Sequence, residues 1–400
     1  MRILVSAYAC EPGKGSEPGV GWNFLQELSK RDGLEIWAIT RANNRTCIEC
    51  GAAWTERIHW IWFDIPRTWT FWKKGSRGVQ LYYFLWQHGI YRFIRKQIAN
   101  GQLPVFDHIY HITFGNYWMP SFLGKLNIPF TFGPVGGGEQ TPPGWNNCYS
   151  PSGKRKELIK KAAIRLFRYF PGTRSAYHSM THVLAATEQT RNAILPFVNC
   201  PVTVVPQSGL SNEDLQHMRK IALETHRPCH PVFITACRLE HWKAVNLAID
   251  AFALFHKRHP DAVLEILGKG PERPRLESQV ARLGLADCVH FLNRLPSLDD
   301  VYRKIASATA LLHPALHEAF GQVCLESLAL GTPVICWDWG GPSLIARHTG
   351  LAVPVEKNNP STSVAQFSMA MENVLSFHSK GNLWNPQFEW KNVVKAILEN

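Results

Sequence analysis

Residues 231–270 read PVFITACRLEHWKAVNLAIDAFALFHKRHPDAVLEILGKG, and their pattern decides the fold. Residues 232–236 and 262–267 are short apolar runs that predict buried strands, and the spacing of apolar residues at 244–257 predicts a helix between them. A strand, a helix and a second strand in this order are typical of a parallel sheet. We therefore expect an α/β fold.

The same alternation extends in both directions and forms two series. The second series adds helices at 272–283, 298–306 and 322–330 and strands at 288–292, 309–313, 333–336 and 351–354. The first, less regular series has strands at 3–7, 35–40, 105–112, 128–132 and 182–186 and a helix at 20–30. Two series of this kind predict two doubly wound, Rossmann-like domains.

A turn rich in Pro and Gly separates the two series. Thr203-Val-Val-Pro-Gln-Ser-Gly209 reads as a strand that closes into this turn. We predict an N-terminal domain at 1–206, a C-terminal domain at 207–375 and a tail at 376–400 that packs back on the N-terminal domain. The length of 400 residues fits two domains, because one hydrophobic core rarely serves more than about 250–300 residues.

The composition is that of an ordinary globular protein, with 45% hydrophobic and 18% charged residues, which excludes a disordered or collagen-like chain. No apolar stretch reaches the ~20 residues that a transmembrane helix needs. The N-terminus shows no signal-peptide pattern, so we expect a cytoplasmic protein. The net charge of +12 predicts an anionic partner, such as nucleic acid, anionic lipid or a phosphorylated substrate.

Two glutamates flank the start of a predicted helix in the second series. Glu318 lies in the loop after a strand, and Glu326 lies within the helix that follows. Open α/β sheets bind ligands at this edge, and the N–H groups of Phe320, Gly321 and Gln322 at the helix start suit hydroxyl or anionic oxygens. Because an isolated glutamate is usually a solvated surface residue, the inference of a ligand site depends on the pair.

Two basic residues follow the first strand of the same series. Arg238 offers a planar guanidinium and Lys243 a point charge. Such a pair can hold a diphosphate and neutralise it as it leaves. The alternative interpretation is a charge pair on the protein surface.

These segments resemble the retaining glycosyltransferases of family 4, also called group 1. Glu318 and Glu326 stand in the family's setting Glu-Ala-Phe-Gly-x-x-x-x-Glu, and Arg238 to Lys243 match its Arg-Leu-x-x-x-Lys. Further similarities follow in the family's order at Leu267-Gly-Lys-Gly-Pro271, Phe291-Leu-Asn-Arg-Leu-Pro296, Gly331-Thr-Pro333 and Gly340-Gly-Pro342. The resemblance covers essentially the whole chain and is to members from bacterial polysaccharide biosynthesis.

The resemblance implies the GT-B fold, in which two doubly wound domains face each other across a cleft. It implies a donor that is a sugar linked to UDP or GDP, with no other cofactor. By the same resemblance, Glu326 binds the ribose hydroxyls, and Glu318 and the amides of 320–322 hold the sugar hydroxyls. Arg238 and Lys243 clamp the pyrophosphate, and Gly268 and Gly270 lie near the base or phosphates. No Asp-x-Asp sequence occurs, so no metal is expected, and protein side chains would neutralise the diphosphate.

The first domain contributes a Gly-rich loop and a histidine. Gly13-x-Gly15-x-x-x-Gly19 is one residue off the dinucleotide-binding pattern, which argues against a nicotinamide oxidoreductase. The loop resembles instead the N-terminal loop of a subgroup of these transferases, where Gly19 and Gly21 would face the donor diphosphate. His111 lies at the end of a predicted strand, and the resemblance implies that it points into the cleft beside the transferred sugar. A structural role is the alternative for this histidine.

Over half of the net charge lies in residues 154–174. This segment has one acidic residue, Glu157, and eight basic residues that alternate with apolar ones. The basic residues are Lys154, Arg155, Lys156, Lys160, Lys161, Arg165, Arg168 and Arg174. This pattern predicts a helix on an anionic membrane surface. Tryptophans mixed with basic residues would add interfacial anchors. The tryptophans are Trp54, Trp60, Trp62, Trp69, Trp72 and Trp86, and the basic residues are Arg57, Lys73, Lys74 and Arg77. The alternatives are core packing of the aromatics and, without a recognised motif, nucleic-acid binding, which we do not expect.

Together these features predict a metal-independent, retaining transferase. It would move a sugar from a nucleotide donor to a lipid-linked or polysaccharide acceptor for cell-surface glycan synthesis, bound peripherally to the inner face of the plasma membrane. The alternative from another class is a non-catalytic, membrane-associated scaffold with the same fold, because fold alone does not establish activity.

Overall fold

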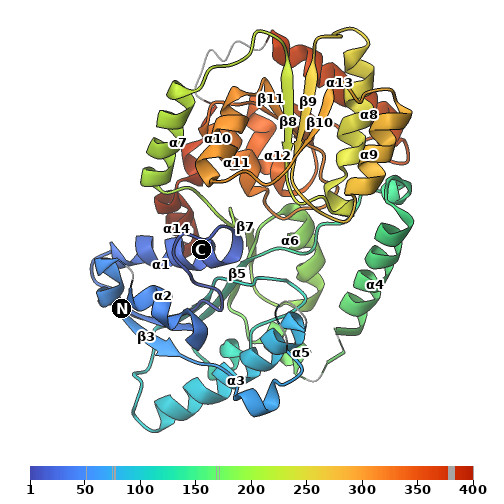
Figure 1. The fold of residues 1–400 in the computed structure, drawn as a ribbon. Helices are drawn as coiled ribbons and strands as arrows, with labels where there is room; N and C mark the ends of the chain where they lie inside the picture. Colours follow the sequence, from blue (N-terminus) through green and yellow to red (C-terminus); the bar gives the residue numbers. More distant parts are fainter. Residues whose placement is uncertain are drawn as a thin grey trace. The chain divides into compact units, whose positions relative to one another are not determined.

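The computed structural model describes residues 1–50, 52–73, 75, 78–167, 169–170, 172–376 and 383–399 (Figure 1). The chain divides into two compact units. Unit 1 comprises Met1–Gly138, Ala162–Gly209 and Trp390–Asn400, and unit 2 comprises Glu139–Lys161 and Leu210–Glu389. The main division thus falls three residues after the predicted one, and 139–161, which we had placed in the N-terminal domain, group with unit 2.

Unit 1 is built on a parallel sheet, which among the described residues has seven strands in the order β3-β2-β1-β4-β5-β6-β7. The strands are β1 Arg2–Ser6, β2 Glu35–Thr40, β3 Ile58–Trp62, β4 His108–His111, β5 Phe130–Val135, β6 His182–Ala185 and β7 Val202–Val204. The helices are α1 Ser16–Ser29, α2 Arg45–Glu49, α3 Val79–Ala99, α5 Thr173–His178, α6 Glu188–Ile194 and α14 Trp390–Leu398. Short 3-10 turns lie at Ala42–Asn44, Ala53–Arg57, Arg67–Trp69, Leu123–Leu126 and Leu195–Phe197. The strand order reverses between β1 and β4, as in doubly wound sheets.

The central strands of unit 1 are apolar because both faces of the sheet are covered. Ile3, Leu4 and Val5 of β1 are each at most 1% exposed. In α14, Trp390, Val393, Val394 and Ile397 recur at helical spacing and join the same cluster as residues of β1 and α1. The segment predicted as a tail is therefore divided: 383–389 pack in unit 2 and α14 packs in unit 1.

Unit 2 carries a second parallel sheet, with six strands among the described residues in the order β10-β9-β8-β11-β12-β13. The strands are β8 Val232–Ala236, β9 Val263–Leu267, β10 Val289–Leu292, β11 Ala310–His313, β12 Val334–Trp337 and β13 Ala352–Val353. The helices are α7 Asn212–Glu224, α8 Val245–His256, α9 Arg273–Arg282, α10 Leu298–Ser307, α11 Gln322–Ala329, α12 Gly340–Ala346 and α13 Pro360–Leu375. Short 3-10 turns lie at Trp145–Cys148, His241–Lys243 (η7), Arg347–Thr349 and Pro386–Phe388. Helix α4, Pro151–Phe167, begins in unit 2 and runs past Lys161 into residues assigned to unit 1.

The order of the second sheet decides where a ligand can bind. The chain moves outward from β8 to β9 and β10 on one side and from β11 to β12 and β13 on the other, so the order reverses between β8 and β11. Open α/β sheets bind ligands at the carboxyl ends of the strands beside such a reversal. The loops after β8, β9, β10 and β11 therefore frame the candidate site.

The tryptophans that we considered as membrane anchors mostly pack inside unit 1. Trp86 is fully buried, the rings of Trp60 and Trp62 stack at 5.5 Å, and Trp54 packs against Trp22 at 4.6 Å. Trp69, at 75% exposed, is the exception. The prediction of an interfacial anchor is wrong for Trp86 because its helix, α3, packs on the sheet through this ring. Lys74, Arg77 and Arg168, which belonged to the predicted basic segments, lie outside the described residues.

Within the described part of the chain, no helix is both long enough and apolar enough to cross a membrane.

Candidate functional site

A cavity of about 630 Å³ lies at the carboxyl edge of the second sheet. The segments that follow β8, β9 and β10 line it, together with residues of α10 and α11. Three of the predicted donor-site residues, Arg238, Gly268 and Glu326, line this one cavity. The fold thus brings together residues from three separate βα units at the edge where doubly wound sheets hold ligands.

Glycine shapes one wall of the cavity. Gly268 has φ +151°, and a Cβ there would lie 1.9 Å from the carbonyl oxygen of Cys237. A Cβ on Gly270 would lie 2.4 Å from the carbonyl oxygen of Leu239, whose N–H donates to the Lys269 carbonyl at 2.9 Å. Only glycine allows the loop after β9 to lie this close to the loop after β8. The predicted contact of these glycines with a base or phosphate stays a prediction.

Three cations surround the cavity. Arg238 follows β8, Lys269 follows β9 and Arg294 follows β10, and all three side chains are exposed. Three positive charges in one concave site favour an anion such as a diphosphate. Lys269 and Arg294 lie in segments that resemble the family, but neither was predicted from the sequence as a site residue. Their common position, directly after a strand of the same sheet, is the signal that would have identified them.

Glu326 supplies the one carboxylate among the residues that line the cavity in the described structure. It lies in the second turn of α11, and its side chain is half-buried. Burial raises the pKa of Glu326 to about 7, Asp214 adds to the increase, and a hydrogen bond from Gln322 opposes it. The carboxylate therefore titrates near neutral pH, so its capacity to accept hydrogen bonds from ligand hydroxyls depends on pH.

The affinity for a nucleotide sugar is expected to fall as the pH falls through the pKa of Glu326. Only the ionised carboxylate can accept hydrogen bonds from both ribose hydroxyls, so protonation removes part of the binding free energy. A pKa near 7 predicts an affinity that is weaker by up to about tenfold at about pH 6 than at about pH 8, the ratio of the ionised fractions. Calorimetric titration with a nucleotide sugar, whose diphosphate has no titrating proton in this range, measures the effect. Glu326→Gln is the control, and an equally steep profile in that variant would contradict the assignment.

Lys243, Glu318 and His313 form a charged cluster beside the same sheet edge. Lys243 Nζ donates to Glu318 Oε1 at 2.6 Å, and His313 Nε2 lies 2.6 Å from Glu318 Oε2. Burial alone would raise the pKa of Glu318, but His313 and Lys243 outweigh it and hold this pKa well below its usual range. Burial would lower the pKa of Lys243, yet Glu318 raises it, so both groups stay charged.

The pairing changes the interpretation of two predicted residues. We had assigned Lys243 to the diphosphate and Glu318 to the sugar hydroxyls, and the structure places them in contact with each other. The thiol of Cys237, which lines the cavity, lies within electrostatic reach of both. The ion pair therefore lies next to the cavity, and it positions the loops that carry both residues.

The loop from Glu318 to the start of α11 is held in place by its neighbours. Gly321 caps α11 with φ +95°, a left-handed conformation that favours glycine. The N–H of Gly341 donates to the carbonyl of Glu318 at 2.8 Å, which joins α12 to this loop. The amides at Phe320, Gly321 and Gln322 thus begin α11, and their contact with sugar hydroxyls stays a prediction.

His111 is fully buried in unit 1, at the end of β4. Its Nε2 lies 2.7 Å from the Tyr83 hydroxyl and its Nδ1 lies 3.0 Å from the Ser6 hydroxyl. Burial lowers the pKa of His111 to about 3, so the ring is neutral. Because both ring nitrogens are engaged, this geometry favours the structural alternative, and the predicted contact with a donor sugar stays untested.

The Gly-rich loop packs against its own backbone. A Cβ on Gly19 would lie 2.2 Å from the carbonyl oxygen of Lys14, and one on Gly21 would lie 2.2 Å from that of Ala9. Both glycines therefore allow the first two turns of α1 to approach the loop, whatever else they contact. Sequence reasoning missed Glu17, whose carboxylate accepts the N–H of Phe114 at 2.6 Å and whose pKa is raised by burial.

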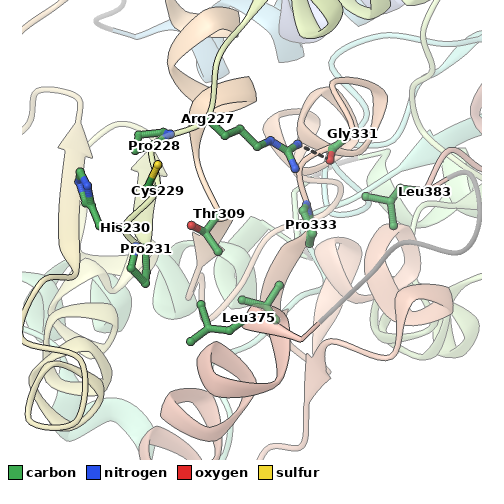
Figure 2. A pocket seen from close by; sticks show the side chains of 11 residues that line it. Arg227, Pro228, Cys229, His230, Pro231, Thr309, Gly331, Pro333, Leu375 and Leu383 are labelled. Atoms are coloured by element: carbon green, nitrogen blue, oxygen red, sulfur yellow. Dashed lines mark hydrogen bonds between the residues drawn. The ribbon is translucent and has the colours of Figure 1, made fainter.

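A second concave region lies at the opposite edge of the second sheet (Figure 2). Pro231, Thr309 and Pro333, which line it, directly precede β8, β11 and β12. Arg227 Nη2 donates to the carbonyl of Gly331 at 2.8 Å, so its guanidinium is used in holding the backbone. This is the amino-terminal edge of the strands, where doubly wound sheets do not place their ligands.

Cations and a carboxylate at the switch point of a doubly wound sheet are features of α/β proteins that bind phosphorylated nucleosides. Residues 222–378 match the family model of the glycosyl transferases group 1. The chain therefore carries a group 1 glycosyltransferase domain at 222–378, which confirms the resemblance to group 1 glycosyltransferases. The D-inositol 3-phosphate glycosyltransferase of Jonesia denitrificans is 24% identical over 314 residues, which cover 72% of this chain and 70% of that protein. Two further proteins of that description match over 40% and 38% of their own length.

Solved structures share the fold of the whole chain. The lipopolysaccharide outer core galactosyltransferase WaaB matches with a TM-score of 0.63 and 16% identity, over 100% of this chain and 99% of that one. HepE of Anabaena, whose structure contains UDP and glucose, matches with a TM-score of 0.51 and 17% identity, over 99% and 98%. The prediction of a GT-B glycosyltransferase fold with two doubly wound α/β domains is confirmed.

Proposed function

We propose that this chain transfers a sugar from a nucleotide-diphosphate sugar to a lipid-linked or polysaccharide acceptor with retention of the anomeric configuration. The observation that carries the proposal is the cavity of unit 2, where Arg238, Lys269 and Arg294 surround the same space as Glu326. Cations suit a diphosphate, and a carboxylate suits the ribose hydroxyls of the same ligand. Their combination in one cavity matches the chemistry of a nucleotide donor.

The proposed mechanism uses protein charges in place of a metal. The bond between the anomeric carbon and the diphosphate oxygen breaks with its electron pair on the oxygen, and Arg238 with its two neighbouring cations stabilises that developing charge. The acceptor oxygen bonds to the same face of the sugar and passes its proton to the departing diphosphate oxygen on that face. Glu318, whose two oxygens contact Lys243 and His313, would accept sugar hydroxyls with its remaining lone pairs, while these two neighbours keep it ionised.

The activity is tested by nucleotide release. Purified protein is incubated with UDP- and GDP-linked sugars, with and without a lipid-linked or polysaccharide acceptor, and free UDP or GDP and the product's anomeric configuration are measured. We expect release with one base series and an axial or equatorial linkage that matches the donor. A bound donor at ten times its Kd should raise the free energy of unfolding by about 1.4 kcal/mol. If no donor reacts and none stabilises the protein, the scaffold alternative is favoured.

Helix α4 supports the membrane part of the proposal. Leu158, Ile159 and Leu166 are 70%, 59% and 66% exposed, and they share the outward side of the helix. Lys161 and Arg165 are exposed beside them. An apolar stripe flanked by bases is the surface that binds anionic bilayers, which is also where a lipid-linked acceptor lies.

Lys161→Gln/Arg165→Gln is expected to weaken binding to anionic vesicles about thirtyfold, because each base near such a surface contributes about 1 kcal/mol. Cosedimentation with vesicles that contain phosphatidylglycerol measures the binding. Arg219→Gln/Lys220→Gln removes two exposed bases from α7 and serves as the matched control. Equal losses in both variants, or equal binding to neutral vesicles, would refute a role for α4.

A further inference from the structure

We propose that Glu157, His241 and His317 form a binding site for a divalent transition metal of the zinc class. One ligand atom from each residue lies within 4.8 Å of the other two. Glu157 Oε1 is 2.9 Å from His241 Nε2 and 3.1 Å from His317 Nε2. All three residues belong to unit 2, and the site is separate from the diphosphate cavity, for which we expect no metal.

The three ligands come from separate elements that meet in the interior. Glu157 lies on α4, His241 begins the turn η7 after β8, and His317 lies in the loop after β11. The residues are 7%, 4% and 8% exposed. Gly153 makes the approach possible, since a Cβ there would lie 2.7 Å from the Cβ of His241. Both imidazoles contact the buried carboxylate through Nε2, and the same three atoms would ligate a cation placed between them.

The donor set and its dimensions fit a tetrahedral ion. Two imidazole nitrogens and a carboxylate oxygen are ligands that Zn²⁺ and Co²⁺ accept. Metal–ligand bonds of about 2.0–2.1 Å put tetrahedral ligands about 3.3 Å apart. The two carboxylate–imidazole separations of 2.9 and 3.1 Å are a few tenths of an ångström shorter than this, and the two imidazole nitrogens lie within 4.8 Å of each other, so small side-chain rotations would complete the geometry. Three protein ligands leave one coordination position for water. The positive charge of Lys160 acts on Glu157 and His317 and therefore lowers the affinity of the site for a cation.

The ligands lie beside the residues of the candidate active site. His241 is two residues before Lys243, and His317 immediately precedes Glu318. The two loops are already joined by a hydrogen bond from the Leu316 N–H to the Trp242 carbonyl at 2.9 Å. A metal held by both imidazoles would fix these loops to α4. The three ligands are thus positioning residues for the Lys243–Glu318 pair and take no part in sugar transfer themselves.

Metal binding by the full chain tests the proposal directly. The protein is freed of metal with a chelator and titrated with Co²⁺, whose visible absorption reports four-coordinate binding, and then with Zn²⁺, which should displace it. We expect one equivalent to bind and to raise the melting temperature. Glu157→Gln and His317→Ala should each weaken binding at least tenfold.

Glu372→Gln is the matched control, because it changes a carboxylate that holds a histidine, His259, at 2.6 Å outside the proposed site. It should leave metal binding unchanged. Absence of one-to-one binding, or binding that Glu157→Gln and His317→Ala leave intact, would overturn the site. Loss of stability in Glu157→Gln with metal binding unaltered would identify a hydrogen-bonded cluster only. Because metal binding is read without a nucleotide, its failure is separable from failure of the proposed transferase function.

Discussion

Arg238→Ala is expected to lower kcat about 10²- to 10³-fold, with a much smaller change in KM for the donor. Arg238 lines the cavity just after β8, where its guanidinium can donate hydrogen bonds to the charge that develops on the leaving diphosphate. A contact that strengthens in the transition state lowers kcat when it is removed, whereas a uniform binding contact raises KM. Steady-state kinetics with a saturating acceptor separate the two.

Arg303→Ala is the matched control for this prediction. Arg303 is an exposed arginine in the same unit, and its Nη1 donates to Asp300 at 3.1 Å. Its removal should leave kcat within twofold of the wild type. An Arg238→Ala enzyme with normal kcat, or one in which KM alone rises, would exclude Arg238 from stabilising the leaving group.

Lys243→Met is expected to lower the free energy of unfolding by about 2–4 kcal/mol, because it leaves the Glu318 carboxylate buried without its ammonium partner. The two side chains are 14% and 21% exposed and 2.6 Å apart. Urea denaturation measures the loss. The double variant Lys243→Met/Glu318→Gln should recover part of it, since the unpaired charge is then removed as well.

Lys395→Met offers a comparison in which both partners are exposed. Lys395 Nζ lies 3.7 Å from Glu399 Oε1, and the two side chains are 61% and 62% exposed. Its loss should cost less than about 1 kcal/mol, as for surface ion pairs. If Lys243→Met cost no more than this, or if the double variant showed simple additivity, the pair would not be the organising contact that the geometry indicates.

The sequence predicts the second sheet well because its strands are short apolar runs, and all of those described except β8 are followed by a loop with Gly or Pro. The first sheet is harder: β3, with the sequence Ile-His-Trp-Ile-Trp, was not predicted, because aromatic and polar residues at a sheet edge do not form a continuous apolar run. The grouping of 139–161 with unit 2 was also missed. That grouping depends on contacts such as the hydrogen bond from Ser150 to Glu272, 122 residues away, which no local pattern encodes.

Some residues of the candidate site could likewise be predicted from the sequence, and others could not. Arg238 and Glu326 could be predicted because each has a fixed place relative to a strand or helix start, whereas Gly268 was implied only by the family resemblance. The structure gathers all three in one cavity. The Lys243–Glu318 pairing could not, because spacing along the chain does not say which charges meet in space. The Glu157–His241–His317 cluster is a further case, since its members are 84 and 160 residues apart.

The central claim is that unit 2 holds a nucleotide diphosphate with Glu326 on its ribose. Calorimetric titration of UDP and of GDP into the wild type and Glu326→Ala tests it most directly, with Glu277→Ala, an exposed glutamate of α9, as the control. We predict that one nucleotide binds the wild type and the control at one equivalent, and that Glu326→Ala weakens it at least tenfold, as expected for lost hydrogen bonds to a charged group. Equal affinity in Glu326→Ala, or no binding of either nucleotide to the wild type, would contradict the account.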